Sequence, residues 1–417
     1  MYNQSFGASI LLKNLRKTDF YDDNNLYDKS HRESVGVSAE NSAHSEFKGE
    51  NPFRTFHLNG KQLYKIEGLD NNLIVRHIDR NLRKSLGKRI FSRDFIISTT
   101  SKLLGESIPY RVYRLDIKSF FESIDHEFLK HEINTLNATA LTKRNTFCLL
   151  DYYKNINGTG VPRGIGISST LAEITLSRFD AKIFGQDNVY YYIRYVDDIL
   201  IITNGNEDKG NFLSWIESQL PPKLMLNKAA HKFEIHDLLQ APKLADTDDQ
   251  LLGSITYLGY VMKIYNPKKT SSQKSAIRKI VLDIADSKVS KIKTRIVRAF
   301  LTYARDNNFL NLKDRLRLLT SNYSMYDINS GRKKFAGIYY NYPLISENSK
   351  SISNLDAFMK NAILSKKGRI FSATYSLTTS KQKSDLLQFT FKMGFDQKKF
   401  AHFSPAKVKK LQHCWSK

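Results

Sequence analysis

The interpretation of this chain starts from one stretch, YYYIRYVDDILIIT at residues 190–203. Aromatic and β-branched residues on both sides of an acidic pair are typical of two short strands joined by a tight turn. The adjacent carboxylates of Asp197 and Asp198 repel each other, and burial penalises their ionised form. A divalent cation relieves both costs, and Mg²⁺ favours hard oxygen ligands of this kind. The alternative at this point is a solvated hairpin turn, because Asp is common in turns.

A second run, YRVYRLDIKSFF at residues 110–121, places another carboxylate, Asp116, at the end of a strand-like segment. Asp116 precedes Asp197 by 81 residues, which leaves room for two or three intervening elements. One carboxylate at a strand end and a pair at a hairpin tip can hold two metal ions in line. In phosphoryl displacement, one ion activates the attacking oxygen and the other stabilises the leaving group. The pattern therefore predicts a two-metal site.

The charge of the chain indicates a polyanionic partner. Its 65 Lys and Arg residues exceed its 41 Asp and Glu residues, which gives a net charge of +24 and a pI near 9.7. A positive electrostatic field of this size is typical of proteins that bind nucleic acid. The alternative is that the protein is generally basic and has no such partner. A length of 417 residues predicts two or three domains.

The composition also excludes several classes of protein. No run approaches the roughly 20 apolar residues that span a bilayer, and the N-terminus has no signal-peptide core. Cys148 and Cys414 lie too far apart in the sequence to indicate a disulfide framework or a zinc site. We therefore expect no membrane association and a reducing, cytoplasmic setting.

Three motifs together resemble those of reverse transcriptases. The turn at residues 195–198 is similar to their metal-binding hairpin, and the run at 115–121 is similar to their first aspartate motif. Between them, GVPRGIGISS at residues 160–169 resembles the glycine-rich loop that enters the palm helix. The order and spacing of the three motifs carry the resemblance, which covers roughly residues 75–330. It implies an α+β fold of the right-hand polymerase type, with palm, fingers and a helical thumb.

The resemblance also implies the metal ligands and a proton donor. The ligands of two Mg²⁺ ions would be Asp116, Asp197, Asp198 and the backbone carbonyl of Ile117. A lysine that follows the motif LMLN can protonate the leaving pyrophosphate. Spacing favours Lys232 for that role.

The alternative proton donor is Lys228. At either position, an ordinary solvated lysine is the competing interpretation.

Five residues are expected to contact the incoming nucleotide: Lys88, Arg89, Arg93, Phe121 and Arg163. The first three belong to a basic segment of helical pattern, and arginine forks suit phosphate. The alternative for this segment is a solvated basic face.

Phe121 would exclude a 2′-hydroxyl by its bulk, and core packing is its alternative role. Arg163 stands where many reverse transcriptases have glutamine, and this departure occurs in the bacterial defence branch.

Two further elements would hold the nucleic acid. Tyr257, Leu258 and Gly259 resemble the primer grip, a tight hairpin that steadies the 3′ end. Apolar residues recur at helical spacing through residues 268–298, which predicts a helical thumb with a basic face along the duplex backbone. The expected backbone contacts are Lys274, Arg278, Lys291 and Arg295.

The predicted organisation follows from these assignments. It comprises an N-terminal extension (1–70), fingers (71–110 and 126–158), a palm (111–125 and 159–265), a thumb (266–330) and a helical C-terminal segment (331–417). Residues 31–52 are polar and small and predict a loop. In the last segment, aromatics among cations either pack a small core or stack single-stranded bases.

The predicted function is that of an RNA-directed DNA polymerase that extends a hydroxyl with dNTPs. The resemblance is strongest to bacterial defence-associated reverse transcriptases of the unknown-group and abortive-infection branch. Within that branch we favour the type 2 kind, which copies its own structured noncoding RNA into antiphage complementary DNA. The oligomeric state is left open by the sequence.

The alternatives are a retron or group II intron enzyme, a template-independent polymerase of the abortive-infection type, and an RNA-binding assembly protein with an idle polymerase site. A retron enzyme should show a Val-Thr-Gly motif, and an intron enzyme should have a longer maturase region. Neither feature is found in the sequence.

Overall fold

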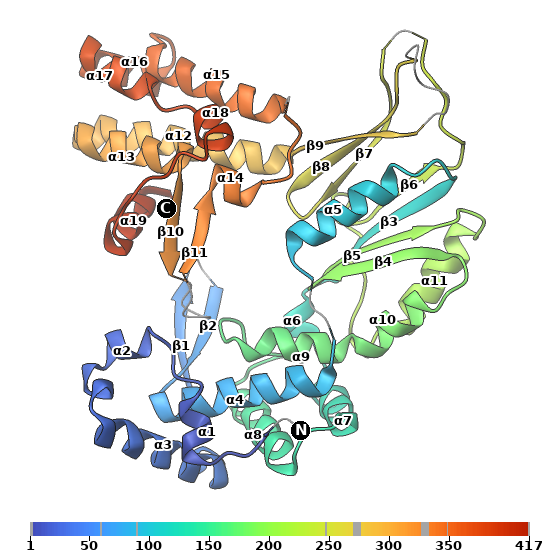
Figure 1. Ribbon diagram of the computed structural model, residues 1–417, viewed down its shortest axis with the longest axis vertical. Coiled ribbons are helices and arrows are strands. Elements are labelled where there is room, and N and C mark those ends of the chain that lie inside the picture. Colours follow the sequence, from blue (N-terminus) through green and yellow to red (C-terminus); the bar gives the residue numbers. More distant parts are fainter. Residues whose placement is uncertain are drawn as a thin grey trace. The chain divides into compact units, whose positions relative to one another are not determined.

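The computed structural model describes residues 3–58, 61–88, 91–246, 248–269, 277–326, 333–347 and 349–415. The chain divides into two compact units. The first unit comprises Met1–Ile90, Pro109–Leu239 and Ile328–Gly331. The second comprises Phe91–Ile108, Gln240–Asp327 and Arg332–Lys417. The elements of both are labelled in Figure 1.

The first unit combines a four-stranded sheet with helices and a separate hairpin. Its helices are α1 (Ala8–Leu12), α2 (Asp19–Asp22), η1 (Asn24–Tyr27), α3 (Lys29–His44), η2 (Phe47–Gly49), α4 (Leu69–Leu86), α6 (Phe120–Ser123), α7 (His126–Thr135), α8 (Ala140–Asn155), α9 (Ile167–Thr175), α10 (Ser177–Phe184) and α11 (Lys209–Gln219). Its strands are β1 (Phe53–Leu58), β2 (Lys61–Ile66), β3 (Tyr110–Asp116), β4 (Val189–Tyr195), β5 (Asp198–Thr203) and β6 (Glu234–Leu238).

The four-stranded sheet has the order β4-β5-β3-β6 and is antiparallel throughout (Figure 1). Five of the six residues of β5 are buried, which explains why this central strand is an unbroken apolar run after Asp198. The edge strand β4 has one buried residue, and Tyr190 and Tyr195 on it are exposed. The strands predicted from residues 110–121 and 190–203 are therefore confirmed.

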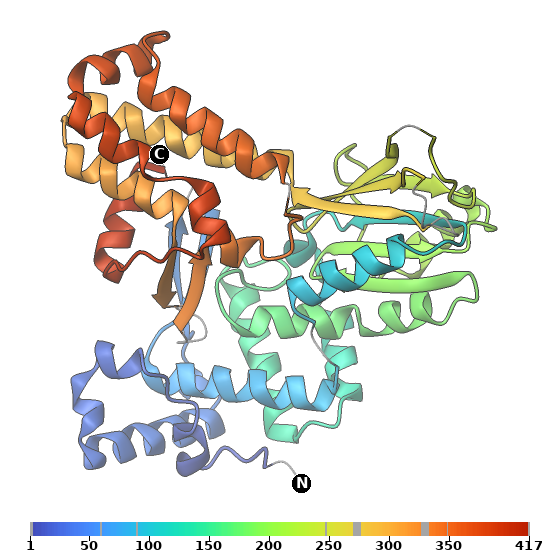
Figure 2. The same ribbon diagram turned by 45° about the horizontal axis from the view of Figure 1, so that its top comes forward.

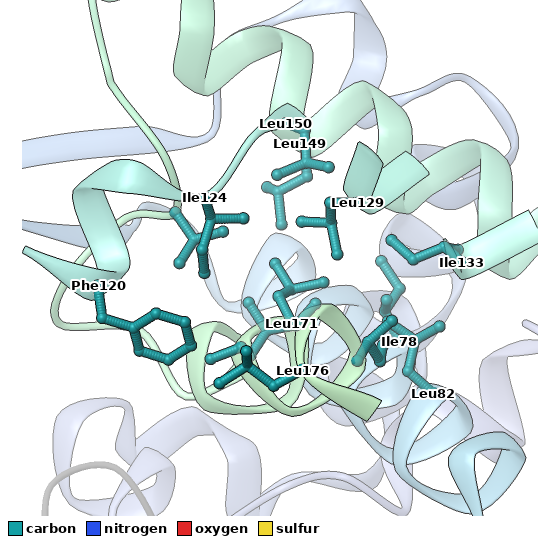
Figure 3. Packing of buried hydrophobic residues seen from close by; sticks show 14 of the residues in the cluster. Ile78, Leu82, Phe120, Ile124, Leu129, Ile133, Leu149, Leu150, Leu171 and Leu176 are labelled. Atoms are coloured by element: carbon teal, nitrogen blue, oxygen red, sulfur yellow. The ribbon is translucent and has the colours of Figure 1, made fainter. Parts of the chain in front are cut away.

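The main core of the first unit lies where helices from three parts of the sequence meet. Figure 3 shows Leu82 from α4, Leu129 from α7, Leu149 from α8 and Leu171 from α9 converging in one cluster. Each of these side chains is at most 2% exposed. Burial of a leucine contributes about 1.5–3 kcal/mol. This cluster therefore holds α4, α7, α8 and α9 together.

The predicted loop at residues 31–52 is wrong over most of its length, because α3 occupies Lys29–His44. The buried residues on its inner face are small, among them Gly36, Ala39 and Ala43. A Cβ on Gly36 would lie 3.0 Å from the side chain of Leu12 in α1. Small residues let the helices approach closely, but they give no apolar periodicity that a sequence pattern could detect.

The second unit contains two small sheets and a helical bundle. Its helices are α5 (Arg93–Leu104), α12 (Asp286–Asp306), α13 (Phe309–Thr320), α14 (Ile338–Asn341), α15 (Lys350–Leu364), α16 (Arg369–Leu377), α17 (Ser380–Leu387), α18 (Phe391–Asp396), α19 (Pro405–Gln412) and η3 (His413–Trp415). Its strands are β7 (Gln250–Tyr257), β8 (Tyr260–Asn266), β9 (Lys279–Ile284), β10 (Asn322–Tyr326) and β11 (Lys333–Gly337). The long helices of the bundle appear in orange and red in Figure 2.

The prediction of helix from residue 268 onward is wrong for residues 279–284, and residues 270–276 lie outside the described residues. Residues Lys279–Ile284 form β9, which pairs with β8, and the helix α12 begins at Asp286. Ile280, Val281 and Ile284 satisfy a helical spacing, but β-branched residues also favour strands. Pairing with the edge of β8 favours the strand over the helix for these residues. This edge belongs to another strand, so the local sequence pattern does not show it.

None of the helices in the described ranges is long and apolar enough to cross a membrane. Both cysteines, Cys148 and Cys414, are free thiols.

Candidate active site

The sheet of the first unit brings the three predicted metal-binding aspartates to one end. Asp116 is the last residue of β3 and pairs in register with Asp198, the first residue of β5. Asp197 lies in the turn that connects β4 to β5. The backbone N–H of Ile117 donates to the carbonyl of Asp197 at 3.3 Å. Residues that lie 81 positions apart in the sequence are thus joined through backbone pairing.

The turn that carries Asp197 has a residue in the left-handed region, Val196, with φ of 60°. A β-branched residue rarely adopts this conformation, so the surrounding structure must hold it there. The Nη1 atom of Arg194 donates to the carbonyl oxygen of Val196 at 2.7 Å. Arg194 thereby connects the strained turn to the interior of the unit.

Arg194 is 3% exposed and is paired with two carboxylates. Its guanidinium donates to both oxygens of Glu173 in α9, at 3.0 and 2.8 Å. It also donates to both oxygens of Asp180 in α10, at 3.0 and 2.8 Å. Paired hydrogen bonds of this kind fix orientation as well as charge. We call Arg194, Glu173, Asp180 and Lys88 the Arg194 cluster.

Lys88 is the fourth member of this cluster, although the sequence suggested a nucleotide contact for it. Its ammonium pairs with Asp180 and lies 3.6 Å from Glu173. Burial and the neighbouring charge of Arg194 lower the pKa of Lys88 to about 8. The structure thus places Lys88 inside a cluster of two cations and two anions rather than at a free phosphate-binding position.

The carboxylate of Asp116 is 5% exposed and is held by two polar side chains. The Nζ atom of Lys232 lies 2.6 Å from Oδ2, and the side-chain amide of Asn227 donates to Oδ1 at 2.9 Å. The backbone N–H of Asn227 also donates to the carbonyl of Asp116 at 2.7 Å. Of the two candidate lysines, Lys232 is therefore the one placed at the aspartates, whereas Lys228 pairs with Glu217 at 2.9 Å and is largely exposed.

The electrostatics of the site reflect the burial of neighbouring carboxylates, although Arg114 lies 4.0 Å from Asp198 and Lys232 pairs with Asp116. Burial raises the pKa of Asp197, and the charge of Asp116 raises it further. Burial and the charge of Asp197 likewise raise the pKa of Asp198. Burial alone would lower the pKa of Lys232, but its hydrogen bond to Asp116 and the charges of the three aspartates raise it. Lys232 is therefore protonated at neutral pH.

This donor set fits a divalent cation in charge and chemistry, because carboxylate oxygens are hard ligands and the raised pKa values of Asp197 and Asp198 mean that their ionised forms gain from a nearby positive charge. Within the described ranges, no three His, Cys, Asp or Glu side chains are already arranged around a point that could hold a metal. The ammonium of Lys232 takes one oxygen of Asp116 instead. Metal binding at all three aspartates thus requires the Asp116 carboxylate to be shared or released by Lys232.

The glycine-rich loop packs directly on the residues that follow Asp116. A Cβ on Gly160 would lie 1.9 Å from the carbonyl oxygen of Phe121, so only glycine fits there. The backbone N–H of Val161 donates to that same carbonyl at 2.8 Å. Phe120 is buried in the core, whereas Phe121 is only partly buried. The loop therefore positions Phe121 as the member of the pair that has an open side.

Arg163 projects from the same loop. Its guanidinium pairs with the carboxylate of Glu122 at 2.5 Å and lies over the ring of Phe121, 5.6 Å from the centroid. The hydrogen bond to Glu122 raises the pKa of Arg163, and the charge of Asp197 contributes to this shift. Arg163 is thus within electrostatic range of the aspartates.

The predicted primer grip is a two-residue turn between β7 and β8 in the second unit. Leu258 and Gly259 have φ values of 47° and 85°, the pattern of a type I′ turn. The Nε atom of Arg93 donates to the carbonyl of Leu258 at 2.8 Å. Its guanidinium carbon lies 4.8 Å from the ring centroid of Tyr260 and 5.3 Å from that of Tyr342. Arg93 therefore supports this turn, and its predicted contact with the triphosphate is not what the geometry shows.

The prediction that Arg278 contacts nucleic acid is wrong. Its side chain is 3% exposed, and its guanidinium donates to the backbone carbonyls of Glu106, Ile108 and Gln240. A buried guanidinium that satisfies three carbonyls cannot reach a phosphate.

The other predicted nucleic-acid contacts have different surroundings. Lys291 is exposed on α12, whereas Arg295 lies over the ring of Trp415, 5.6 Å from the centroid. Arg89 and Lys274 lie outside the described residues.

The sequence interpretation missed two groups that shape the site. Arg194 and its carboxylate partners were hidden because Glu173 and Asp180 lie on separate helices. Asn227 is the last residue of the LMLN motif, and its two hydrogen bonds to Asp116 depend on tertiary pairing that the motif does not show. The arginine directly before the YVDD turn is the available signal for the first group, since a charge within a run of aromatic and β-branched residues requires partners where it is buried.

Residues 84–261 match the family described as "Reverse transcriptase (RNA-dependent DNA polymerase)". The matched range is less than half of the chain, and it contains Asp116, Asp197, Asp198 and Lys232. Residues 84–261 of the chain are thus similar to a reverse transcriptase domain. No curated protein matches the chain.

Two telomerase structures are among the solved structures that resemble this chain. Telomerase from Candida albicans, in complex with a TWJ fragment of telomeric RNA, is 12% identical with a TM-score of 0.33. The match covers 82% of this chain and 53% of that one. Apo telomerase from Candida tropicalis is 14% identical with a TM-score of 0.35, and the match covers 82% and 56% of the two chains. This chain therefore spans about half the length of those telomerases.

Proposed function

We propose that this protein is a reverse transcriptase that extends a 3′-hydroxyl, or a hydroxyl on a protein, by copying an RNA template with dNTPs. The observation that carries the proposal is the register of the sheet, which sets Asp116 opposite Asp198 with Asp197 in the adjoining turn. Three carboxylates from two distant motifs at one sheet end are what a two-metal nucleotidyl transfer requires.

In this proposal Asp116, Asp197 and Asp198 would hold two Mg²⁺ ions, together with the carbonyl of Ile117. The ions would supply activation of the attacking hydroxyl and charge stabilisation of the leaving pyrophosphate. Lys232 would donate a proton to the pyrophosphate, because its raised pKa keeps it protonated beside the aspartates. Asn227 would keep the Asp116 carboxylate oriented when Lys232 turns toward the substrate.

The nucleotide would lie against the partly buried ring of Phe121, which leaves no room for a 2′-hydroxyl. Arg163, whose guanidinium lies over the ring of Phe121, would contact the nucleotide after exchanging its partner Glu122 for a phosphate. The predicted palm would then comprise the four-stranded sheet, with α4 and α5 in the fingers and α12 in the thumb. The turn at Leu258 and Gly259 would serve as the primer grip.

We further propose that the template is a structured noncoding RNA and that the DNA product acts in bacterial antiphage defence. The support is the resemblance of the glycine-rich loop, which has arginine at position 163 as in the defence branch. The large positive charge supports a partner with a long phosphate backbone.

A primer-extension assay tests the catalytic proposal. A double variant, Asp197→Ala with Asp198→Ala, should lower DNA synthesis on an RNA template by at least about a thousandfold, because it removes two of the three proposed metal-binding carboxylates. RNA binding should change little. A matched control is Asp248→Ala, whose side chain is 95% exposed and whose loss should not affect synthesis. Undiminished synthesis by the double variant would refute the proposed site.

A second experiment addresses the template and the defence role. RNA and DNA that co-purify with the wild-type protein from phage-challenged bacteria are sequenced, and the double variant serves as the control. The proposal expects one enriched noncoding RNA, complementary DNA only with the wild type, and protection only with the wild type. Protection by the double variant would show that defence does not depend on DNA synthesis.

A further inference from the structure

The second unit has a surface of aromatic and basic residues that take no part in the proposed catalytic site. Two copies of the same tetrapeptide, Lys-Lys-Phe-Ala, contribute to it, at residues 333–336 and 398–401. The ring centroids of Phe335 and Phe400 lie 6.0 Å apart, so the two copies meet in space. We call residues 333–340 and 398–402 the KKFA surface.

The rings of this surface are open to solvent rather than packed in a core. Phe335 and Tyr340 stack face to face, with centroids 5.0 Å apart and an interplanar angle of 22°. Phe335 is 52% exposed and Tyr340 is 39% exposed. His402 continues the row, 5.0 Å from Phe400. Exposed aromatic faces are costly in water unless a partner covers them.

Cations border these rings. Lys398 lies over the ring of Tyr339, 4.5 Å from its centroid, and Lys333 lies 6.0 Å from the centroid of Phe335. Both copies of the tetrapeptide place two exposed lysines before the phenylalanine. Neither segment contains an acidic residue, and Asp396 is the nearest acid along the chain.

A buried asparagine holds the two segments together. Asn322, the first residue of β10, is 0% exposed. Its side-chain amide donates to the carbonyls of Gly394 and Lys399 at 2.8 and 3.1 Å, and its side-chain oxygen accepts from the N–H of Tyr339 at 3.0 Å. Its backbone also pairs with both segments, in register with Gly337 and in a bridge to Phe400. A satisfied buried network of this kind gives the surface a defined shape.

We propose that the KKFA surface binds single-stranded RNA, with unpaired bases stacked on Phe335 and Tyr340 and phosphates held by the lysines of the two repeats. Stacking of bases on exposed rings within a positively charged groove is the general mode for single strands. A duplex hides its base faces and cannot use the rings. The choice of RNA over DNA rests on the proposed function, in which the unpaired strand is the template and the DNA product is paired with it.

Fluorescence anisotropy with the full-length protein and a fluorescein-labelled, unstructured RNA of 12 nucleotides tests this proposal. The double variant Phe335→Ala with Tyr340→Ala should weaken RNA binding by at least about tenfold, the loss expected when stacking is removed. Binding of an RNA duplex of the same length should change less than twofold. Equal losses for single strand and duplex would overturn the proposal.

Three further variants separate stacking from other effects. Phe335→Tyr with Tyr340→Phe keeps the ring faces and should bind as the wild type does. Phe184→Ala removes a ring that is 72% exposed in the first unit and should leave RNA binding unchanged. Lys333→Gln with Lys398→Gln should reduce the salt dependence of log Kd by about one to one and a half units of slope. An unchanged slope, or a loss of affinity with Phe184→Ala alone, would contradict the assignment.

Two comparisons separate the failure of this inference from failure of the proposed function. The alanine double variant should extend a fully annealed RNA–DNA primer–template at the wild-type rate, since the KKFA surface is outside the aspartate site. If the wild type extends the primer while single-stranded RNA binds both proteins equally, this inference alone is wrong. Tighter binding of single-stranded DNA than of RNA with the same sequence would refute the choice of RNA.

Discussion

In two tight turns of this protein an arginine donates to a backbone carbonyl of the turn, but different groups hold the two arginines in place. The β4–β5 turn has Val196 at φ of 60°, and the β7–β8 turn has Leu258 at φ of 47°. In each turn, an arginine donates to the carbonyl of that residue, at 2.7 Å from Arg194 and 2.8 Å from Arg93. A branched residue with positive φ is unfavourable on its own. The arginines therefore stabilise backbone conformations that the turn sequences would not adopt alone.

The surroundings of the two arginines differ. Arg194 is buried between the carboxylates of Glu173 and Asp180, whereas Arg93 lies over the rings of Tyr260 and Tyr342. The two carboxylates balance the charge of Arg194 and fix the orientation of its planar guanidinium through paired hydrogen bonds. Aromatic rings attract Arg93 without cancelling its charge. The first arrangement suits a turn that must present its own acidic side chains, and the second suits a turn that is expected to approach a phosphate backbone.

The largest expected effect is that of Arg194→Met. It leaves Glu173 and Asp180 buried with Lys88 as the remaining cation of the cluster, which should lower the free energy of unfolding by about 3–5 kcal/mol. It also frees the carbonyl of Val196, so the aspartates of the turn shift. We expect kcat for primer extension to fall by about a hundredfold, with a smaller change in KM for dNTPs. Denaturant unfolding and steady-state kinetics measure the two effects.

Arg194→Lys provides the diagnostic comparison for this prediction. It keeps the charge but loses the paired geometry, so stability should recover more than kcat does. The exposed Arg144→Met, which removes a surface pair with Glu46, should change stability by less than about 0.5 kcal/mol. If Arg194→Lys restored kcat fully, charge balance rather than orientation of the turn would be the role of this arginine.

A smaller effect is expected for Arg93→Leu. The carbonyls of Leu258 and Asn341 lose a charged donor, and the rings of Tyr260 and Tyr342 lose a cation. Together these losses should lower the free energy of unfolding by about 1–3 kcal/mol. Primer–template affinity should fall while kcat on saturating primer stays near that of the wild type. Losses as large as those of Arg194→Met would remove the distinction between the two turns.

The residues that could be predicted from the sequence are those whose signal is local. The strands around Asp116 and Asp197 were found because β-branched runs with an acidic end are a short-range pattern. The spacing from the LMLN motif favours Lys232 as the proton donor, and the Nζ atom of Lys232 lies 2.6 Å from the carboxylate of Asp116. The register that sets Asp116 opposite Asp198 is known only from the structure.

The residues that could not be predicted depend on tertiary partners. Arg278 resembles any other basic residue of its segment, and only the fold shows that three backbone carbonyls surround it. The same holds for Lys88 and Arg93, whose partners come from distant elements. A basic residue in a nucleic-acid-binding protein can equally satisfy a buried acceptor, and the sequence does not show which acceptors lack a donor.

The smallest expected effect concerns the difference in charge between the two turns. The β4–β5 turn carries the carboxylates of Asp197 and Asp198, whereas the β7–β8 turn carries none. The pKa of Asp198 is raised above its ordinary value of 3.8 by burial and by the charge of Asp197. The folded protein therefore takes up this proton more readily than the unfolded chain. Ionised Asp198 costs stability at neutral pH, and this cost disappears as the pH falls below the ordinary value.

Asp198→Asn should accordingly raise the Tm of the metal-free protein at pH 7.5, by about 2–4 °C if the cost is ~1 kcal/mol. The difference from the wild type should shrink as the pH is lowered toward 4. Added Mg²⁺ should raise the Tm of the wild type more than that of Asp198→Asn, because a cation offsets the same repulsion. Scanning calorimetry with and without Mg²⁺ measures all three, and the exposed Asp248→Asn should show none of them. A variant that is destabilised at pH 7.5 would mean that the contacts of Asp198, such as that with Arg114 at 4.0 Å, outweigh the cost of its burial, and repulsion between the carboxylates would then not be what a metal relieves at this turn.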